Sequence, residues 1–301
     1  MAGSGLSVAV VDAPSNLGLS PPEAGREPGV RGLASALRAR AIVTRLDAED
    51  GGGLAPPPYS PEVEPATGTR NGEAIRRFAL DLAGRVADVV GSGRFPLVLG
   101  GDCSILIGGM LALRRMGRFG LVFVDGHLDF RHPGNSARLG AVAGEDLAVV
   151  TGRGPERLAN IDRLGPLVRD EDVVALGERE DYPEWRDIHG TGITVWDLGR
   201  LRTVGFAEAA EMAVVKLVAN GVEGFWLHLD ADVLHDDLMP AVDSRQPGGM
   251  SYGELVELLG VLLRSGLAVG MEVTIFDPEL DPTGEIAEGF TGAIVESFAG
   301  R

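Results

Sequence analysis

The sequence predicts an α/β fold, namely a single three-layer α/β/α domain, residues 1–301, around a doubly wound, mainly parallel sheet of eight strands. Short aliphatic runs lack the polar alternation of half-exposed strands, which indicates burial on both faces. Longer amphipathic segments lie between these runs. The composition, 45% hydrophobic but only 5% aromatic over 301 residues, can fill a large aliphatic core. Strands interleaved with helices are typical of this architecture.

Each expected element follows from one of two periodicities. The apolar runs predict strands at 7–11, 41–46, 96–99, 121–124, 173–176, 193–197, 224–229 and 269–274. Apolar residues spaced by three and four predict helices at 30–40, 73–90, 104–115, 206–219, 251–264 and 286–298. The Gly- and Pro-rich stretch 51–65 predicts a long surface loop, placed to form a lip over a site.

Composition also narrows the range of partners and compartments. The net charge of −17 argues against nucleic acid and against an anionic membrane surface, because both require clustered Lys and Arg. A small cationic molecule fits better. The single cysteine excludes an internal disulfide. No apolar run approaches about 18 residues, and the N-terminus lacks the basic segment of a secretion signal, so we expect a cytoplasmic protein.

Four short segments place acidic and metal-binding side chains where apolar runs stop: 100–104 (GGDCS), 125–129 (DGHLD), 230–232 (DAD) and 272–274 (EVT). Ligands of doubly wound folds bind beyond the carboxyl ends of the strands. Clustered buried carboxylates would repel one another unless cations lay between them. Six ligands exceed the needs of one ion, which predicts two ions about 3.5–4 Å apart. The candidate ligands are Cys103, Asp125, His127, Asp129, Asp230 and Asp232.

These segments resemble the signatures of the ureohydrolase family (arginase, agmatinase, formiminoglutamase), which read Gly-Gly-Asp-His-Ser, Asp-Ala-His-x-Asp, Asp-x-Asp and a late Glu. The resemblance spans roughly residue 98 to the C-terminus and implies an arginase-like fold with two manganese ions. Cys103 stands where the family has His, and its softer sulfur leaves zinc or cobalt open. Alternatively, Cys103 is a buried residue that binds nothing. The implied ligands are Cys103, Asp125, Asp129 and Asp230 for one ion, and Asp125, His127, Asp230 and Asp232 for the other.

The resemblance further implies a hydrolytic mechanism. A hydroxide bridging the two ions would attack the guanidinium carbon, Asp129 would take its proton, and Glu272 would hold the guanidinium by a bidentate hydrogen bond. Arginases carry a proton-shuttle His where this sequence has Ala143. His228 alternates with Asp230 along a strand and is a candidate acid instead. A hydrogen-bonded His behind a metal ligand is the alternative role for it.

Further residues are candidates for binding the substrate. The loop after the second motif contacts the substrate carboxylate in arginases, and here it contains Arg131 and Asn135. The strand end that contacts a substrate amino group in the family contains Glu180 and Asp181, and Asp243 is expected near the mouth of the site. Solvated surface positions are the alternative for these residues.

We therefore expect a hydrolase of a carbon–nitrogen bond in a guanidino or amidino compound. An N-hydroxyguanidine would suit Ala143, because its less basic leaving nitrogen needs less help from a proton shuttle. The alternative is a metal-binding or regulatory protein that kept the fold and lost the chemistry. A third alternative is an acyl-lysine hydrolase with an Asp-x-His zinc site, but this sequence lacks the tandem His pair that such enzymes use. The resemblance also implies a homo-oligomer, a trimer or hexamer.

Overall fold

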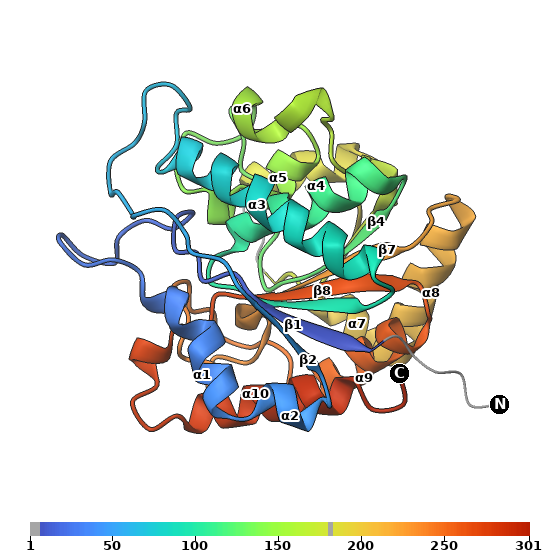
Figure 1. The fold of residues 1–301 in the computed structure, drawn as a ribbon. Coiled ribbons are helices and arrows are strands. Elements are labelled where there is room, and N and C mark those ends of the chain that lie inside the picture. The colour runs from blue at the N-terminus through green and yellow to red at the C-terminus, as the bar shows by residue number, and fades with distance from the viewer. Residues whose placement is uncertain (1–6, 180–182) are drawn as a thin grey trace.

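Eight parallel strands form one sheet, which confirms the predicted fold class (Figure 1). The computed structural model describes residues 7–179 and 183–301. Across the sheet the strand order is β2-β1-β3-β8-β7-β4-β5-β6, and each neighbouring pair is parallel. The strands are β1 Val8–Asp12, β2 Glu49–Gly53, β3 Phe95–Leu99, β4 Gly120–Val124, β5 Val173–Leu176, β6 Thr194–Trp196, β7 Phe225–Asp230 and β8 Ala268–Thr274.

Helices cover both faces of the sheet, so the central strands are buried on both sides, as their continuous apolar sequences predict (Figure 1). Val98, Leu121 and Phe123 pack against α3 to α6 on one face. Leu97 and Val122 pack with α1, α2 and α7 to α10 on the other. The helices are α1 Leu33–Ala39, α2 Ile42–Arg45, α3 Gly72–Gly91, α4 Leu106–Met116, α5 Asp146–Val150, α6 Glu156–Ala159, α7 Leu198–Val204, α8 Phe206–Ala219, α9 Tyr252–Arg264 and α10 Glu285–Ser297.

The strand predicted at 41–46 is wrong. Ile42–Arg45 forms the short helix α2, and its fully buried Ile42 packs into the core. A six-residue apolar run fits both periodicities, and here packing selected the helix. The actual edge strand, β2, has the sequence EDGGG and carries no apolar signal. At residue 51 glycine is favoured because the backbone of β1 lies close by: a Cβ there would lie 2.9 Å from the carbonyl oxygen of Val10.

The four central strands β3, β8, β7 and β4 are consecutive neighbours in the sheet. Because all run parallel, their carboxyl ends meet at one edge, and the four acidic segments follow or end these strands. The fold therefore brings segments from residue 100 to residue 274 together. None of the helices in the described ranges is long and apolar enough to cross a membrane.

Candidate active site

The Cys103 segment is held by a buried network at the end of β3. Asp102 is fully buried and accepts hydrogen bonds from the Ser104 amide (2.9 Å) and the Ser15 hydroxyl (2.6 Å). It thus caps the short 3-10 turn Cys103–Ile105 that leads into α4. Cys103 follows directly, and its Sγ donates to Asp230 Oδ2 at 2.9 Å. The turn therefore points the thiol at a carboxylate from another strand.

The segment after β4 supplies two acids and an imidazole. Asp125 Oδ1 accepts from the His127 amide at 2.6 Å, which folds the chain back at this point. His127 Nδ1 lies 2.8 Å from Asp232 Oδ2 and links the β4 and β7 segments. Asp129 has a φ of 43°, so the regular alternation expected for 125–129 ends in a left-handed turn. This turn places Asp129 in the wall of a cavity.

Three sets of side chains place possible metal-ligand atoms within 4.8 Å of one another. All six predicted ligands belong to at least one set, and Asp125 and Asp230 each belong to two. A shared carboxylate is the arrangement that bridging ligands require. The sets are Cys103, His228 and Asp230; Asp125, His127 and Asp232; and Asp125, Asp129 and Asp230.

The electrostatics of these side chains fit divalent cations. Asp125 Oδ2 is buried and has no hydrogen-bond partner among the described residues. Burial and the nearby Asp232 raise the pKa of Asp125 to about 6. Burial, followed by neighbouring carboxylates, also raises the pKa of Asp129 and Asp230 well above its usual value. Such uncompensated buried acids become favourable when cations neutralise them.

His127 sits between two carboxylates. Burial alone would lower its pKa, but Asp232 and Asp125 outweigh burial and raise it. In turn, burial would raise the pKa of Asp232, but His127 reverses this effect and lowers it. Because imidazole binds metals only when neutral, a cation would have to displace the proton that these acids hold on His127.

A cavity of about 200 Å³ opens onto this centre. Four predicted ligands line it, together with Arg131, Asp243 and Ala143. The volume is below the range typical of drug-sized ligands, which favours a small substrate. The remaining lining residues are Leu19, Ser20, Ala141, Gly144, Ser244 and Ile275.

Comparison with known proteins agrees with the motifs. The family model described as "Arginase family" matches residues 8–300. The chain belongs to the arginase family. It is 29% identical to an arginase of Staphylococcus aureus over 304 aligned residues, which cover 98% of this chain and 97% of that relative. It is 34% identical to an arginase of Brevibacillus brevis over 202 residues, 66% of this chain and 67% of the relative.

Solved structures of this family share the fold. The arginase from Bacillus caldovelox superposes with a TM-score of 0.87 at 27% identity, covering 98% of both chains. Proclavaminate amidino hydrolase from Streptomyces clavuligerus superposes with a TM-score of 0.72 at 21% identity, covering 99% of this chain and 94% of that one, and shows the fold alone. The ureohydrolase resemblance is thereby confirmed, and it reaches further toward the N-terminus than the motifs do.

In this arginase-family chain, Glu272, a predicted substrate-binding residue, lies inside the sheet. It does not line the cavity; it is fully buried inside β8, and its Oε1 lies 2.7 Å from His228 Nδ1. Glu272 lies two residues before the end of β8 at Thr274, and the strand register pairs it with His228 of β7. Ile275, with a φ of 73°, reaches the cavity instead.

His228 is likewise absent from the cavity wall, so the geometry does not support it as an acid acting on a substrate there. It precedes Asp230 by two residues and points into the same buried layer as Glu272. Asn135 also lies away from the cavity; its side-chain amide donates to the Phe130 carbonyl (2.8 Å) and its Oδ1 accepts from the His132 amide (2.8 Å). Glu180 and Asp181 lie outside the described residues.

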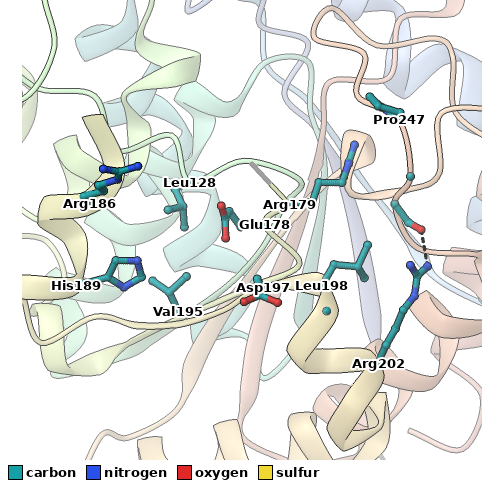
Figure 2. A pocket seen from close by; sticks show the side chains of 13 residues that line it. Leu128, Glu178, Arg179, Arg186, His189, Val195, Asp197, Leu198, Arg202 and Pro247 are labelled. Atoms are coloured by element: carbon teal, nitrogen blue, oxygen red, sulfur yellow. Dashed lines mark hydrogen bonds between the residues drawn. The ribbon is translucent and has the colours of Figure 1, made fainter. Parts of the chain in front are cut away.

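A second cavity, of about 500 Å³, lies on the other side of the β4 segment (Figure 2). Leu128 lines it, whereas its neighbours His127 and Asp129 line the first cavity. Figure 2 shows Arg179 reaching into this region, where its Nη2 donates to the Asp232 carbonyl at 2.7 Å. A Cβ on Gly126 would lie 2.8 Å from the carbonyl oxygen of Asp232, a backbone atom, as well as 2.2 Å from Arg179 Nη1, which favours glycine there. Arg179 thus links the segments that follow β4 and β7, which contain candidate metal ligands.

One further acid, Asp146, is buried near this centre and was not among the predicted site residues. Asp146 starts α5, is fully buried, and accepts from the Leu147 amide at 2.7 Å. Burial, then Asp129 and Asp125, raises its pKa well above the usual value. The five-residue helix α5 is too short for a periodicity signal, so nothing local in the sequence indicates this burial.

Proposed function

We propose that this protein hydrolyses a carbon–nitrogen bond of a small guanidino or amidino compound with the help of two divalent ions, manganese in the first instance. The supporting observation is the convergence of six possible ligands, two of them shared between sets, beside a small cavity. The bound ions would activate a water molecule as the nucleophile. Cys103, Asp125, Asp129 and Asp230 would hold one ion; Asp125, His127, Asp230 and Asp232 would hold the other.

Asp129 is the proposed proton acceptor. It lines the cavity, and burial and Asp125 raise its pKa, so its carboxylate holds a proton more readily than an exposed acid. A proton taken from the attacking water can then pass from Asp129 to the departing amine. Among the described residues lining the cavity, the only imidazole belongs to His127, a proposed ligand. Asp129 is itself a proposed ligand, and it would take the proton from a water bound to the same ion.

Arg131 and Asp243 are the proposed substrate-orienting residues. Both line the cavity, and their opposite charges suit a substrate with an anionic and a cationic end. The Arg131 guanidinium can pair with a carboxylate, and Asp243 can hold a guanidinium or ammonium group. The buried Glu272 leaves this second role to Asp243.

An N-hydroxyguanidine is the proposed substrate variant. Ala143 lines the cavity and offers no proton to a leaving amine. A leaving nitrogen of lower basicity departs with less protonation, so we expect it to be favoured over plain arginine or agmatine. Hydrolysis of the plain guanidine at an equal or higher rate would contradict this choice.

A metal-binding or regulatory role without turnover is the second candidate. Ala143 and Ile275 in the cavity wall favour it, because they supply neither a proton nor a carboxylate where a substrate would lie. Binding of metal without hydrolysis of any guanidino compound would establish this alternative over the enzyme.

The test measures metal content, urea release from a panel of guanidines, and hydroxylamine release from their N-hydroxy forms, after loading with manganese or zinc. We expect turnover in the wild type and a loss of at least about 100-fold in Asp125→Asn, which removes a shared ligand. His235→Gln, which changes a histidine in a loop outside the cavity, is the control and should retain activity. Absence of both metal and turnover would overturn the proposal.

A further inference from the structure

Side chains of the two neighbouring strands hold the His228 ring in one orientation inside the sheet. The strand register pairs it with Glu272 of β8 on one side and with Phe123 of β4 on the other. Its Nδ1 lies 2.7 Å from Glu272 Oε1, and its ring stacks on Phe123 with centroids 4.5 Å apart and planes 7° apart. All three side chains are fully buried. The imidazole is therefore pre-oriented.

The other ring nitrogen of His228 has no protein partner. Nε2 is buried and makes no hydrogen bond to any described residue. Glu272 occupies Nδ1, so Nε2 is the ring nitrogen left without a hydrogen bond among the described residues. A ring nitrogen of His228, Cys103 Sγ and an Asp230 oxygen all lie within 4.8 Å of one another. An imidazole, a thiol and a carboxylate within this distance form a donor set that suits a divalent cation.

We propose that Cys103, His228 and Asp230 coordinate a thiophilic divalent ion such as zinc, with Glu272 orienting His228 from behind. A carboxylate that fixes the far nitrogen of a metal-binding His is a common supporting arrangement. Sulfur and imidazole donors select zinc or cobalt, whereas the set Asp125, Asp129 and Asp230 offers only oxygen and suits manganese.

This proposal shares one premise with the proposed function, namely that metal binds among the clustered ligands beside the small cavity. It replaces the family's imidazole at residue 103 by one from β7, two residues before the shared Asp230. Cys103, which the proposed function places on one ion with Asp125 and Asp129, would instead share its ion with His228, and the oxygen set Asp125, Asp129 and Asp230 would hold a harder ion. Cys103 Sγ and Asp230 Oδ2, 2.9 Å apart, are already within the separation of two ligands on one ion.

The first test titrates the metal-free full-length protein with cobalt and follows the optical spectrum. We expect a thiolate-to-cobalt charge-transfer band and the intense visible bands of a four-coordinate ion. Cys103→Ser should abolish the charge-transfer band. His228→Gln should weaken zinc binding at least about tenfold and alter the visible bands, and Glu272→Gln should weaken it about tenfold with the charge-transfer band retained. His235→Gln should match the wild type.

The second test needs no variant and so does not depend on how the substituted chains fold. X-ray absorption of wild-type protein loaded with one equivalent of zinc should show one sulfur at about 2.3 Å and imidazole nitrogen at about 2.0–2.1 Å. A shell of oxygen alone, or a His228→Gln variant with unchanged cobalt spectrum and affinity, would overturn the proposal. Turnover with such an oxygen shell would leave the proposed function standing, while sulfur ligation without turnover would contradict only that function.

Discussion

At the residue scale, the turn after β3 depends on a glycine for steric reasons. A Cβ on Gly101 would lie 1.7 Å from the carbonyl oxygen of Ser15, whose hydroxyl also holds Asp102. No rotation relieves this clash, because the contact is with backbone. The Gly-Gly of the first motif therefore serves packing, and it fixes where Cys103 points.

We accordingly expect Gly101→Ala to lower the free energy of unfolding by roughly 1–3 kcal/mol and to weaken metal binding, because the Asp102 and Cys103 segment must shift. Gly84→Ala in α3 is the matched control. No atom lies within 4 Å of its added Cβ, and alanine should stabilise the helix by roughly 0.5–1 kcal/mol. Chemical denaturation and zinc titration measure both effects; equal stability of the two variants would contradict the steric argument.

The sequence predicted which residues gather at the site better than it predicted which of them face the cavity. The motifs placed Asp125 and Asp230 at strand ends, and the structure groups both with other ligands. They also suggested that Glu272 meets the substrate; β8 ends at Thr274, as predicted, but pairing with β7 sets Glu272 beside His228 inside the sheet. The apolar run thus indicated where the strand ends, but it carried no information on which side chain of the neighbouring strand Glu272 would contact.

At the element scale, Arg179 joins three strand ends. It follows β5, donates to the Asp232 carbonyl after β7, and lies against Gly126 after β4. Among the influences on Asp232, burial raises its pKa, and Arg179 is one of the groups that lower it. The guanidinium thus helps to keep a proposed ligand ionised while it holds two ligand loops together.

Arg179→Met should therefore weaken metal binding by roughly tenfold, through looser ligand segments and a higher Asp232 pKa. Arg202→Met is the control, since Arg202 lines the same second cavity but bonds to Glu254 (2.9 Å) and the Gly249 carbonyl (2.9 Å). Calorimetric titration with manganese measures the difference. Equal affinity in the two variants would show that Arg179 only fills space.

Helices were predicted with accurate bounds where apolar residues recur at regular helical spacing. Phe206–Ala219 was predicted with its observed bounds, and α9 begins one residue after its Ser251 cap. The edge strand β2 was missed because its pairing with β1, rather than its side chains, holds it in place. Backbone pairing at a sheet edge leaves no mark on hydrophobic pattern.

At the scale of the whole molecule, the buried carboxylates make stability depend on pH and metal together. Burial and Asp232 raise the Asp125 pKa from 3.8 to about 6. In the metal-free protein, this group contributes stability that is complete below about pH 4 and is lost as pH rises through about 6. The stabilisation by bound metal depends on pH in the opposite direction: it increases as pH rises, because metal binds the ionised carboxylate.

We therefore expect the stabilisation by manganese or zinc to grow from pH 5 to pH 8, by about 1.4 kcal/mol per pH unit below pH 6 for each proton displaced. Thermal melts with and without metal measure it. In the metal-free state, Asp125→Asn should reduce the loss of stability across pH 6. A metal effect that is flat with pH would contradict the assignment of these acids as ligands.

The sequence by itself determined the fold class, the family and the six candidate ligands, because these depend on local patterns: buried apolar runs and polar residues at their ends. Only the tertiary structure decided what faces the cavity. Strand register sets Glu272 against His228 and a histidine beside Cys103, and the left-handed turn after β8 brings Ile275 into the cavity wall. Those placements arise from pairing between strands distant in sequence, which no local pattern encodes.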